Sequence, residues 1–241
     1  MNTKCLIIAA GKGRRLQMRG DSKPLVSIFG MPLIERVIRA AHDAGGSDFY
    51  VVTGYLEGKV REFLDLLNEQ LEIPITTIFN EDWEKENGLS VLKGRQHLNE
   101  SFLLLMADHI FDPSIARKLI ASPLNDGEIA LGVDTNLKNP LVNLDDVTKV
   151  ARKNGKICDI GKTLENFDGF DTGIFHCTPA IFSAIERSSE RGDTSLSGGV
   201  RILAEENRVN AVDVGGHYWV DVDDPEALRW AENVLLNHLP G

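Results

Sequence analysis

Two glycines and a group of cationic side chains follow the first apolar segment of the chain. Residues 6–8 are Leu-Ile-Ile, an apolar run typical of a buried parallel strand. Gly11 and Gly13 come next, and glycines let backbone N–H groups approach a ligand without interference from a Cβ atom. The cations beside them are Lys12, Arg14, Arg15 and Lys23. This combination at the carboxyl end of a strand favours a bound polyanion such as a nucleoside triphosphate.

Two common phosphate-binding motifs do not fit this loop. A dinucleotide-binding fingerprint needs a third glycine three residues after Gly13, and this chain has Leu16 there. The Gly-Lys-Ser/Thr ending of a P-loop is also missing. A nicotinamide-dependent oxidoreductase is therefore disfavoured, and the Lys23-Pro24 pair counts against it as well.

Carboxylates in two distant segments have the pattern of a metal site. Asp108 follows the apolar run 102–107, so it emerges at the edge where open α/β sheets bind ligands. Asp221 and Asp223 would point to the same face of a strand, where two carboxylates repel unless a cation or a proton joins them. Asp224 before Pro225 is explained by a helix cap alone. Hard carboxylate oxygens of this kind suit Mg²⁺.

These segments together resemble the nucleotidyltransferase superfamily, which joins a nucleotide to a phosphorylated sugar or alcohol. The resemblance lies in Gly11-x-Gly13-x-Arg15-Leu16 before Lys23-Pro24, and in the two carboxylate segments. Members usually have Thr or Ser where this chain has Arg14. The resemblance implies nucleotide binding by Ala9, Ala10, Gly11, Gly13 and Arg14, catalytic roles for Arg15 and Lys23, and Mg²⁺ binding by Asp108, Asp221 and Asp223.

Residues 80–90 resemble the base-binding loop of the phosphocholine and inositol-phosphate cytidylyltransferases. The loop has asparagines and a serine at similar spacing, and Asn side chains with a glycine N–H can read the edge of a pyrimidine. The residues that the resemblance assigns to nucleotide binding are Asn80, Asn87, Gly88 and Ser90. For Asn87, capping of the following helix is an alternative that stays open.

The acceptor side of the site rests on residues 160–162 and 170–175. In the family, a lysine at the position of Lys162 meets the acceptor phosphate, and the strand with Thr172 lines the acceptor pocket; without the resemblance, Lys162 would read as a solvated lysine. Residues 134–182 contain four Phe and no Trp or Tyr, whereas a choline pocket favours a Trp or Tyr cage. Asp134, Asp171 and Thr172 suit a polyol better, since hydroxyl groups need paired donors and acceptors.

The chain resembles the inositol-1-phosphate cytidylyltransferases most closely. The implied reaction transfers CMP from CTP to inositol 1-phosphate and gives CDP-inositol and pyrophosphate. Three alternatives stay open: a phosphocholine cytidylyltransferase, a sugar-1-phosphate nucleotidyltransferase, and a non-catalytic nucleotide-sensing domain. The last should have lost its metal ligands, and all three candidate carboxylates are present.

Composition sets the remaining expectations. A net charge of −10 argues against general nucleic-acid binding. No apolar run approaches the roughly 18–20 residues that span a bilayer, and the start lacks the pattern of a signal peptide. Three cysteines make no disulfide framework, which favours the cytoplasm. Members of the family often carry a membrane-embedded synthase domain, so we expect this chain to be a stand-alone form or an excised domain ending near Pro240. If that synthase is attached, the protein would be tethered to the membrane. A homodimer is compatible with the sequence.

The elements that must position these residues alternate along the chain. The pattern predicts an α/β fold of the nucleotidyltransferase type, with a three-layer, Rossmann-like, mixed and mostly parallel sheet. Strands are predicted at 6–8, 49–53, 73–79, 102–106, 128–134, 147–152, 156–160 and 209–214, and helices at 32–44, 56–67, 89–98, 179–187, 199–206 and 225–237. Asn154-Gly155 predicts a hairpin turn in a small acceptor lobe. We expect one domain, 1–241, with a nucleotide half at 1–126 and an acceptor half at 127–241.

Overall fold

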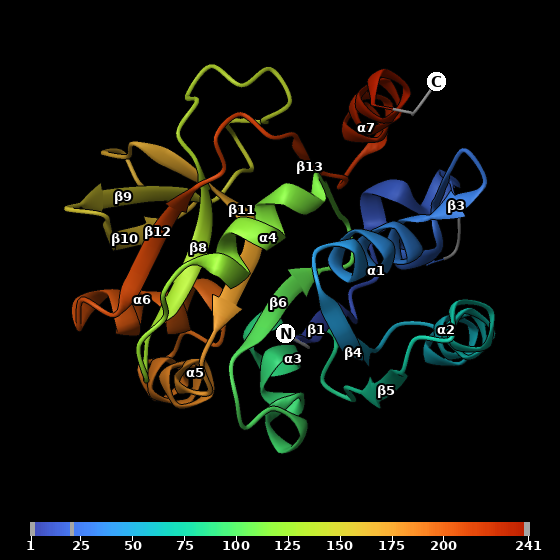
Figure 1. The fold of residues 1–241 in the computed structure, drawn as a ribbon, viewed down its shortest axis with the longest axis horizontal. Helices are drawn as coiled ribbons and strands as arrows, with labels where there is room; N and C mark the ends of the chain where they lie inside the picture. Colours follow the sequence, from blue (N-terminus) through green and yellow to red (C-terminus); the bar gives the residue numbers. More distant parts are fainter. Residues whose placement is uncertain (1–2, 20–21, 239–241) are drawn as a thin grey trace.

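The fold is built on a mixed β-sheet (Figure 1). The computed structural model describes residues 3–19 and 22–238, within which this sheet has nine strands; Pro240 lies outside the described residues. The strands are β1 (Thr3–Ala9), β4 (Gly46–Thr53), β5 (Ile75–Phe79), β6 (Phe102–Met106), β8 (Ile129–Asp134), β9 (Lys149–Lys153), β10 (Lys156–Gly161), β11 (Gly169–Cys177) and β12 (Val209–Asp213). Their order across the sheet is β5-β4-β1-β6-β11-β8-β12-β10-β9.

The strands β5, β4, β1 and β6 are parallel, so their carboxyl ends share one edge of the sheet. β11 runs antiparallel to both β6 and β8, which makes β8 parallel to β6. In β6, Leu103 and Leu105 face one core while Phe102 and Leu104 face the other. Burial on both faces explains why this strand has a continuous apolar sequence rather than an alternating one.

Helices cover both faces of the sheet, as the predicted three-layer fold requires. They are α1 (Leu33–Asp43), α2 (Glu57–Leu71), α3 (Asn87–Lys93), α4 (Pro113–Ala121), α5 (Ala180–Glu190) and α6 (Leu196–Glu205), whereas α7 (Pro225–Asn237) lies outside the two cores of the sheet. Helices α1, α2 and α4 contribute to the core on one face, and α3, α5 and α6 to the core on the other. Each of these helices turns an apolar stripe toward the sheet.

A third, smaller core joins the two ends of the chain. Two short antiparallel pairs lie outside the main sheet: β2 (Ser27–Ile28) with β3 (Met31–Pro32), and β7 (His109–Phe111) with β13 (Trp219–Asp221). Apolar residues of α7 pack with residues of both pairs. In Figure 1, α7 (red) accordingly lies near the N-terminal β2–β3 segment (blue). This packing brings the carboxylates of the C-terminal segment to the N-terminal loop.

The predicted hairpin is confirmed. Asn154 and Gly155 have φ values of +52° and +78°, and β9 and β10 pair on either side of them. β9 also pairs with the first residues of β11, opposite Gly169 and Phe170. This second pairing folds the hairpin back over the sheet and directs the end of β10 toward the site.

Most predicted elements are present with shifted ends. The helix predicted at 89–98 is α3 followed by a 3₁₀ turn, Arg95–His97. The strand expected to hold both Asp221 and Asp223 ends at Asp221, so the same-face argument is wrong for Asp223. Asp224 caps the helix that begins at Pro225, as predicted, and Asp112 caps the helix that begins at Pro113. The described part of the chain has no helix with the length and apolarity to cross a membrane.

Candidate active site

Lys23 connects two carboxylates at the carboxyl edge of the sheet. Its side chain is 9% exposed, and its ammonium group donates to Oδ2 of Asp108 and to Oδ1 of Asp223. Burial lowers the pKa of Lys23, but the two carboxylates outweigh this effect and raise the pKa above its ordinary value. Three segments that are far apart in the sequence therefore meet around one buried, charged lysine.

Gly13 makes room for this lysine. Its φ is +63°, and a Cβ atom at this position would lie 2.3 Å from Cβ of Lys23. Both the left-handed backbone and the close contact require glycine. The second glycine of the loop is thus explained by the way the loop folds over the stem of Lys23.

Asp108, His109 and Asp221 form a compact cluster, with potential ligand atoms within 4.8 Å of one another. Asp221 lies opposite His109 in the β7–β13 pair. Nδ1 of His109 lies 2.8 Å from Oδ1 of Asp108 and 3.9 Å from Oδ1 of Asp221. Oδ1 of Asp221 is buried and has no hydrogen-bond partner among the described residues. Two converging carboxylates with a free oxygen are a donor set that fits Mg²⁺.

Crowding of charge perturbs this cluster. Burial raises the pKa of Asp221 to about 6; His109 opposes this shift, while Asp108 and Asp223 reinforce it. Burial lowers the pKa of His109, but Asp221 and Asp108 outweigh it and raise that pKa to about 9. The site is therefore built from carboxylates that stay close together only because cations lie between them.

Gly173 fixes the position of the His109 ring. It has a φ of +72°, and a Cβ atom there would lie 2.5 Å from Cδ2 of the imidazole. The Gly173 N–H donates to Oδ1 of Asp171 at 2.7 Å, so the same turn also orients this carboxylate. Burial raises the pKa of Asp171 to about 6. The Thr-Gly segment of β11 thus supports the cluster as well as the acceptor side.

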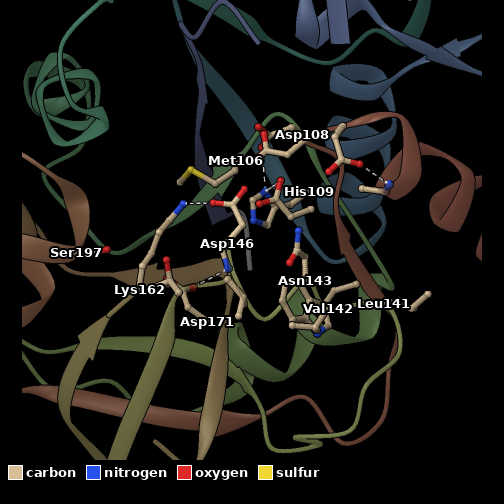
Figure 2. A pocket seen from close by; sticks show the side chains of 18 of the residues that line it. Met106, Asp108, His109, Leu141, Val142, Asn143, Asp146, Lys162, Asp171 and Ser197 are labelled. Atoms are coloured by element: carbon tan, nitrogen blue, oxygen red, sulfur yellow. Dashed lines mark hydrogen bonds and ion pairs between the residues drawn. The ribbon is translucent and has the colours of Figure 1, made fainter. Parts of the chain in front are cut away.

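A chain of ion pairs leads from the cluster to the hairpin lobe. Nη2 of Arg15 lies 2.5 Å from Oδ2 of Asp223, and Nη1 of Arg15 lies 2.6 Å from Oδ2 of Asp146. Nζ of Lys162 lies 2.5 Å from Oδ1 of Asp146, and Figure 2 marks this ion pair with a dashed line. The predicted catalytic arginine and the predicted acceptor lysine are therefore joined by one carboxylate.

A cavity of about 240 Å³ lies between the two halves of the chain. Six of the predicted site residues line it: Asn87, Asp108, Lys162, Asp171, Asp221 and Asp223. Trp219 and Trp230 line it too, although the sequence between residues 134 and 182 predicted an acceptor side without Trp or Tyr. That expectation was wrong for the cavity as a whole, because the aromatic rings come from β13 and α7.

The predicted base-binding residues are engaged with the protein itself. Asn80 is fully buried, and its amide donates to the hydroxyl of Ser90 at 2.9 Å. Oδ1 of Asn87 accepts from the N–H of Leu196 at 2.9 Å, so Asn87 joins α3 to α6 and does not cap its own helix. A Cβ atom at Gly88 would lie 2.4 Å from the Thr194 carbonyl oxygen, which explains the glycine by packing.

The predicted residues of the glycine loop do not line the cavity. Ala9 and Ala10 are buried, and the Ala10 carbonyl accepts from the N–H of Tyr55 at 3.0 Å. Gly11 and Arg14 are exposed on the loop. The solvent-accessible part of the loop is therefore residues 11–15.

Two predicted acceptor residues have structural partners instead. Oδ2 of Asp134 accepts from the indole Nε1 of Trp219 at 3.0 Å, which fixes that ring in the cavity wall. The Thr172 hydroxyl is fully buried and donates to the Gly132 carbonyl at 2.8 Å. Neither residue reaches the cavity, so we do not retain them as direct acceptor contacts.

Sequence reasoning missed His109 and Asp146. His109 could have been found, because it follows Asp108 directly at the end of a buried strand. Asp146 lies in a stretch of polar residues without a motif, and its position beside Arg15 depends on a contact across 131 residues.

The fold and the site define a class of nucleotide-handling protein. A family model described as a MobA-like NTP transferase domain matches residues 5–153, well over half of the chain. The chain belongs to this family. The matched part contains the cationic loop, Lys23 and the Asp108–His109 pair.

More particular relatives are found among bifunctional proteins. The chain is 32% identical over 235 residues to a bifunctional IPC transferase and DIPP synthase of Aquifex aeolicus, covering 96% of this chain and 51% of the relative. A protein of the same name in Rubrobacter xylanophilus is 33% identical over 241 residues, covering 95% and 51%. The chain thus spans about half the length of these relatives.

A solved structure has the same fold. The inositol-1-phosphate CTP transferase from T. maritima superposes with a TM-score of 0.86 at 24% identity, covering 98% of this chain and 95% of that protein. This agreement confirms the predicted fold over nearly the whole chain.

Proposed function

We propose that this chain transfers CMP from CTP to inositol 1-phosphate and releases pyrophosphate and CDP-inositol. The names of the Aquifex and Rubrobacter relatives, and of the T. maritima structure, support this choice of substrates. The observation that carries the proposal is the convergence of Lys23, Asp108 and Asp223, with Lys162 on the wall of the adjoining cavity. Cations and carboxylates in this arrangement suit two phosphorylated substrates that must approach each other.

The chemistry needs no general base from the protein. An oxygen of the acceptor phosphate attacks the α-phosphorus of CTP in line, a new P–O bond forms, and the bond to pyrophosphate breaks. Because the attacking phosphate oxygen is already negatively charged at neutral pH, positioning and charge neutralisation account for catalysis.

Three cations supply that neutralisation. Arg15, at the open end of the loop, binds the β and γ phosphates in place of its present carboxylate partners. Lys23, held between Asp108 and Asp223, stabilises the charge that builds up on the α-phosphate. Lys162, which lines the cavity, neutralises the acceptor phosphate.

Asp108 and Asp221 would hold Mg²⁺, and the hydrogen bond from His109 to Asp108 would orient the first of these carboxylates. Asp223, the third predicted ligand, lies outside this cluster and is paired with Lys23 and Arg15. When bound, the cation supplies a Lewis acid that neutralises phosphate oxygens of CTP. The free oxygen of Asp221 is the feature of the chain that supports this assignment.

A phosphocholine cytidylyltransferase is a second candidate, because Trp219 and Trp230 line the cavity together with several carboxylates. Indole rings and carboxylates can surround a quaternary ammonium group. Indole faces also pack against the apolar face of a polyol ring, and Asp171 can accept from its hydroxyl groups, so the tryptophans suit both acceptors.

A pyrophosphate-release assay separates these candidates. CTP, UTP, GTP, ATP and dTTP are each tested with inositol 1-phosphate, phosphocholine and glucose 1-phosphate. The proposal expects the highest kcat/KM for CTP with inositol 1-phosphate and no reaction with free inositol, which lacks the phosphate nucleophile. Turnover of phosphocholine without turnover of inositol 1-phosphate would reverse the choice of acceptor. Release of pyrophosphate at the same rate with and without an acceptor would contradict the transferase.

A further inference from the structure

Asp146 forms ion pairs with two cations, Arg15, which we assign to the triphosphate, and Lys162, which we assign to the acceptor phosphate. Its Oδ2 lies 2.6 Å from Nη1 of Arg15, and its Oδ1 lies 2.5 Å from Nζ of Lys162. Figure 2 marks the ion pair with Lys162. Arg15 belongs to the triphosphate side of the site and Lys162 to the acceptor side. One carboxylate therefore occupies, with its two oxygens, the positions where two different phosphate groups would make contacts.

The segment that carries Asp146 has a local shape of its own. Residues 135–148 connect β8 to β9 without a helix or strand. Oδ1 of Asn143 accepts from the N–H of Asp145 at 3.1 Å, and the Asn143 carbonyl accepts from the N–H of Asp146 at 3.1 Å. Because this turn depends on Asn143, the Asp146 carboxylate can leave both cations without loss of a sheet hydrogen bond.

We propose that Asp146 is a substrate-displaced bridge that couples the triphosphate and acceptor positions; the identity of the two ligands rests on the proposed function. A carboxylate cannot stay between two cations when a phosphate reaches either of them, because like charges repel at contact distance. Arrival of the first phosphate releases Asp146 and leaves the other cation ready for the second phosphate. The coupling is reciprocal, since each ligand must change the affinity for the other by the same factor.

The ion pairs have a strength that suits displacement. The side chains of Arg15 and Lys162 are 50% and 58% exposed, and that of Asp146 is 28% exposed. Exposed pairs of this kind change an equilibrium by about fivefold at most. We therefore expect Asp146 to lower the affinity for the first ligand by a factor of about two to five. The affinities for the two ligands should be coupled by the same factor.

The test compares wild type with Asp146→Asn by calorimetric titration. The ligands are inositol 1-phosphate and a CTP analogue with a non-hydrolysable α,β linkage, each alone and each in the presence of the other. Asp146→Asn should bind either ligand alone about two- to fivefold more tightly. The factor by which one bound ligand increases the affinity for the other should be two- to fivefold smaller in Asp146→Asn than in wild type. Repulsion between the two bound phosphates is present in both proteins, so it cancels in this comparison.

Asp145→Asn is the matched control. Asp145 is the neighbouring residue, is exposed, and makes no ion pair within the described part of the chain, yet its substitution changes the net charge equally. It should bind both ligands like wild type. Equal effects of the two substitutions would overturn the bridge, as would weaker binding or unchanged coupling in Asp146→Asn.

Inorganic pyrophosphate separates failure of the bridge from failure of the proposed function. It presents the charge that Arg15 would meet, without the base or sugar of a nucleotide. The bridge predicts tighter pyrophosphate binding by Asp146→Asn whichever nucleotide the protein uses, and unchanged pyrophosphate affinity overturns it. A wild-type protein that binds pyrophosphate but neither CTP nor inositol 1-phosphate contradicts the proposed function instead.

Discussion

The two edges of the main sheet treat partly buried carboxylates in opposite ways. At the amino edge, Glu128 precedes β8, and each of its oxygens has a partner. Lys156 donates to Oε1 at 2.6 Å, and Asn125 and Asn210 donate to Oε2 at 3.0 and 3.1 Å. The Lys156 contact is the main cause that lowers the pKa of Glu128 to about 2. At the carboxyl edge, Asp221 has a buried oxygen with no partner among the described residues, and its pKa is raised to about 6.

This difference separates a carboxylate that stabilises the fold from one that is kept available. Glu128 is satisfied by the chain itself, so it has no remaining capacity for a ligand. Asp221 is held next to Asp108 at a cost in electrostatic repulsion, which a bound cation would relieve. The carboxyl edge is also where parallel strands end and loops from distant segments can meet.

The largest effect should come from the cluster. Asp108→Asn and Asp221→Asn should each lower kcat by at least about a hundredfold, since loss of a metal clamp removes several kcal/mol of transition-state stabilisation and 1.4 kcal/mol is already tenfold. The unfolding midpoint of Asp221→Asn should not fall, because an unsatisfied buried charge is removed. Glu128→Gln is the matched control and should leave kcat unchanged. Wild-type turnover of either variant at saturating Mg²⁺ contradicts the assignment.

The two cations of the nucleotide side should differ in which constant they change. Lys23→Ala should lower kcat strongly, because its phosphate partner gains charge in the transition state. It should also destabilise the protein by about 3 kcal/mol, since two carboxylates lose a buried partner. Arg15→Ala should mainly raise the KM for CTP, because terminal phosphates are bound alike in both states. A change confined to KM in Lys23→Ala would show that its role is binding only.

Gly173→Ala tests the support of the cluster. Gly173 and Gly155 have similar φ values of +72° and +78°, but a Cβ atom would meet His109 only at Gly173 and finds open space at Gly155. Gly155→Ala should cost about 1 kcal/mol of stability through backbone strain and leave activity unchanged. Gly173→Ala should cost more, roughly 2–4 kcal/mol, and should lower kcat by displacing His109. If Gly173→Ala and Gly155→Ala lost the same stability in chemical denaturation and the same turnover, the contact between Gly173 and His109 would have no importance.

Lys162→Ala should raise the KM for inositol 1-phosphate by roughly tenfold, the effect of losing one charge-assisted contact of about 1.4 kcal/mol. The KM for CTP should change little, because Lys162 belongs to the hairpin side of the cavity. Steady-state kinetics with each substrate varied in turn provides the measurement. An unchanged KM for the acceptor would remove Lys162 from the site.

The smallest effect belongs to the amino edge. The folded-state pKa of Glu128 is about 2, below its ordinary value of 4.5, so its ionised form contributes stability above pH 4.5. This contribution disappears as the pH falls from 4.5 to 2. Glu128→Gln should therefore be less stable than wild type by about 1 kcal/mol at pH 7, and the two proteins should converge near pH 2. A difference in urea unfolding that stays constant over this range would show that the charge of Glu128 contributes nothing.

The sequence predicted the parts of the site that depend on local pattern. Asp108 was found because a buried strand ends just before it, and Lys23 because the glycine loop followed by Lys23-Pro24 resembles the nucleotidyltransferase signature. Asn80 and Ser90 were assigned to the nucleotide base by resemblance, but they are bonded to each other. The spacing of polar residues in the sequence does not show which hydrogen-bond partner each of them has, because any nearby donor can compete with a ligand.

By itself, the sequence determined most of the strands and helices, the Asp224 cap and the loop chemistry, since apolar period, turn residues and capping side chains act over a few residues. The tertiary structure alone decided which carboxylate meets which cation. Lys23 reaches Asp108 across 85 residues and Asp223 across 200. Such pairs form because the order of strands in the sheet and the packing of α7 bring these segments together, and neither leaves a trace in the sequence around the residues themselves.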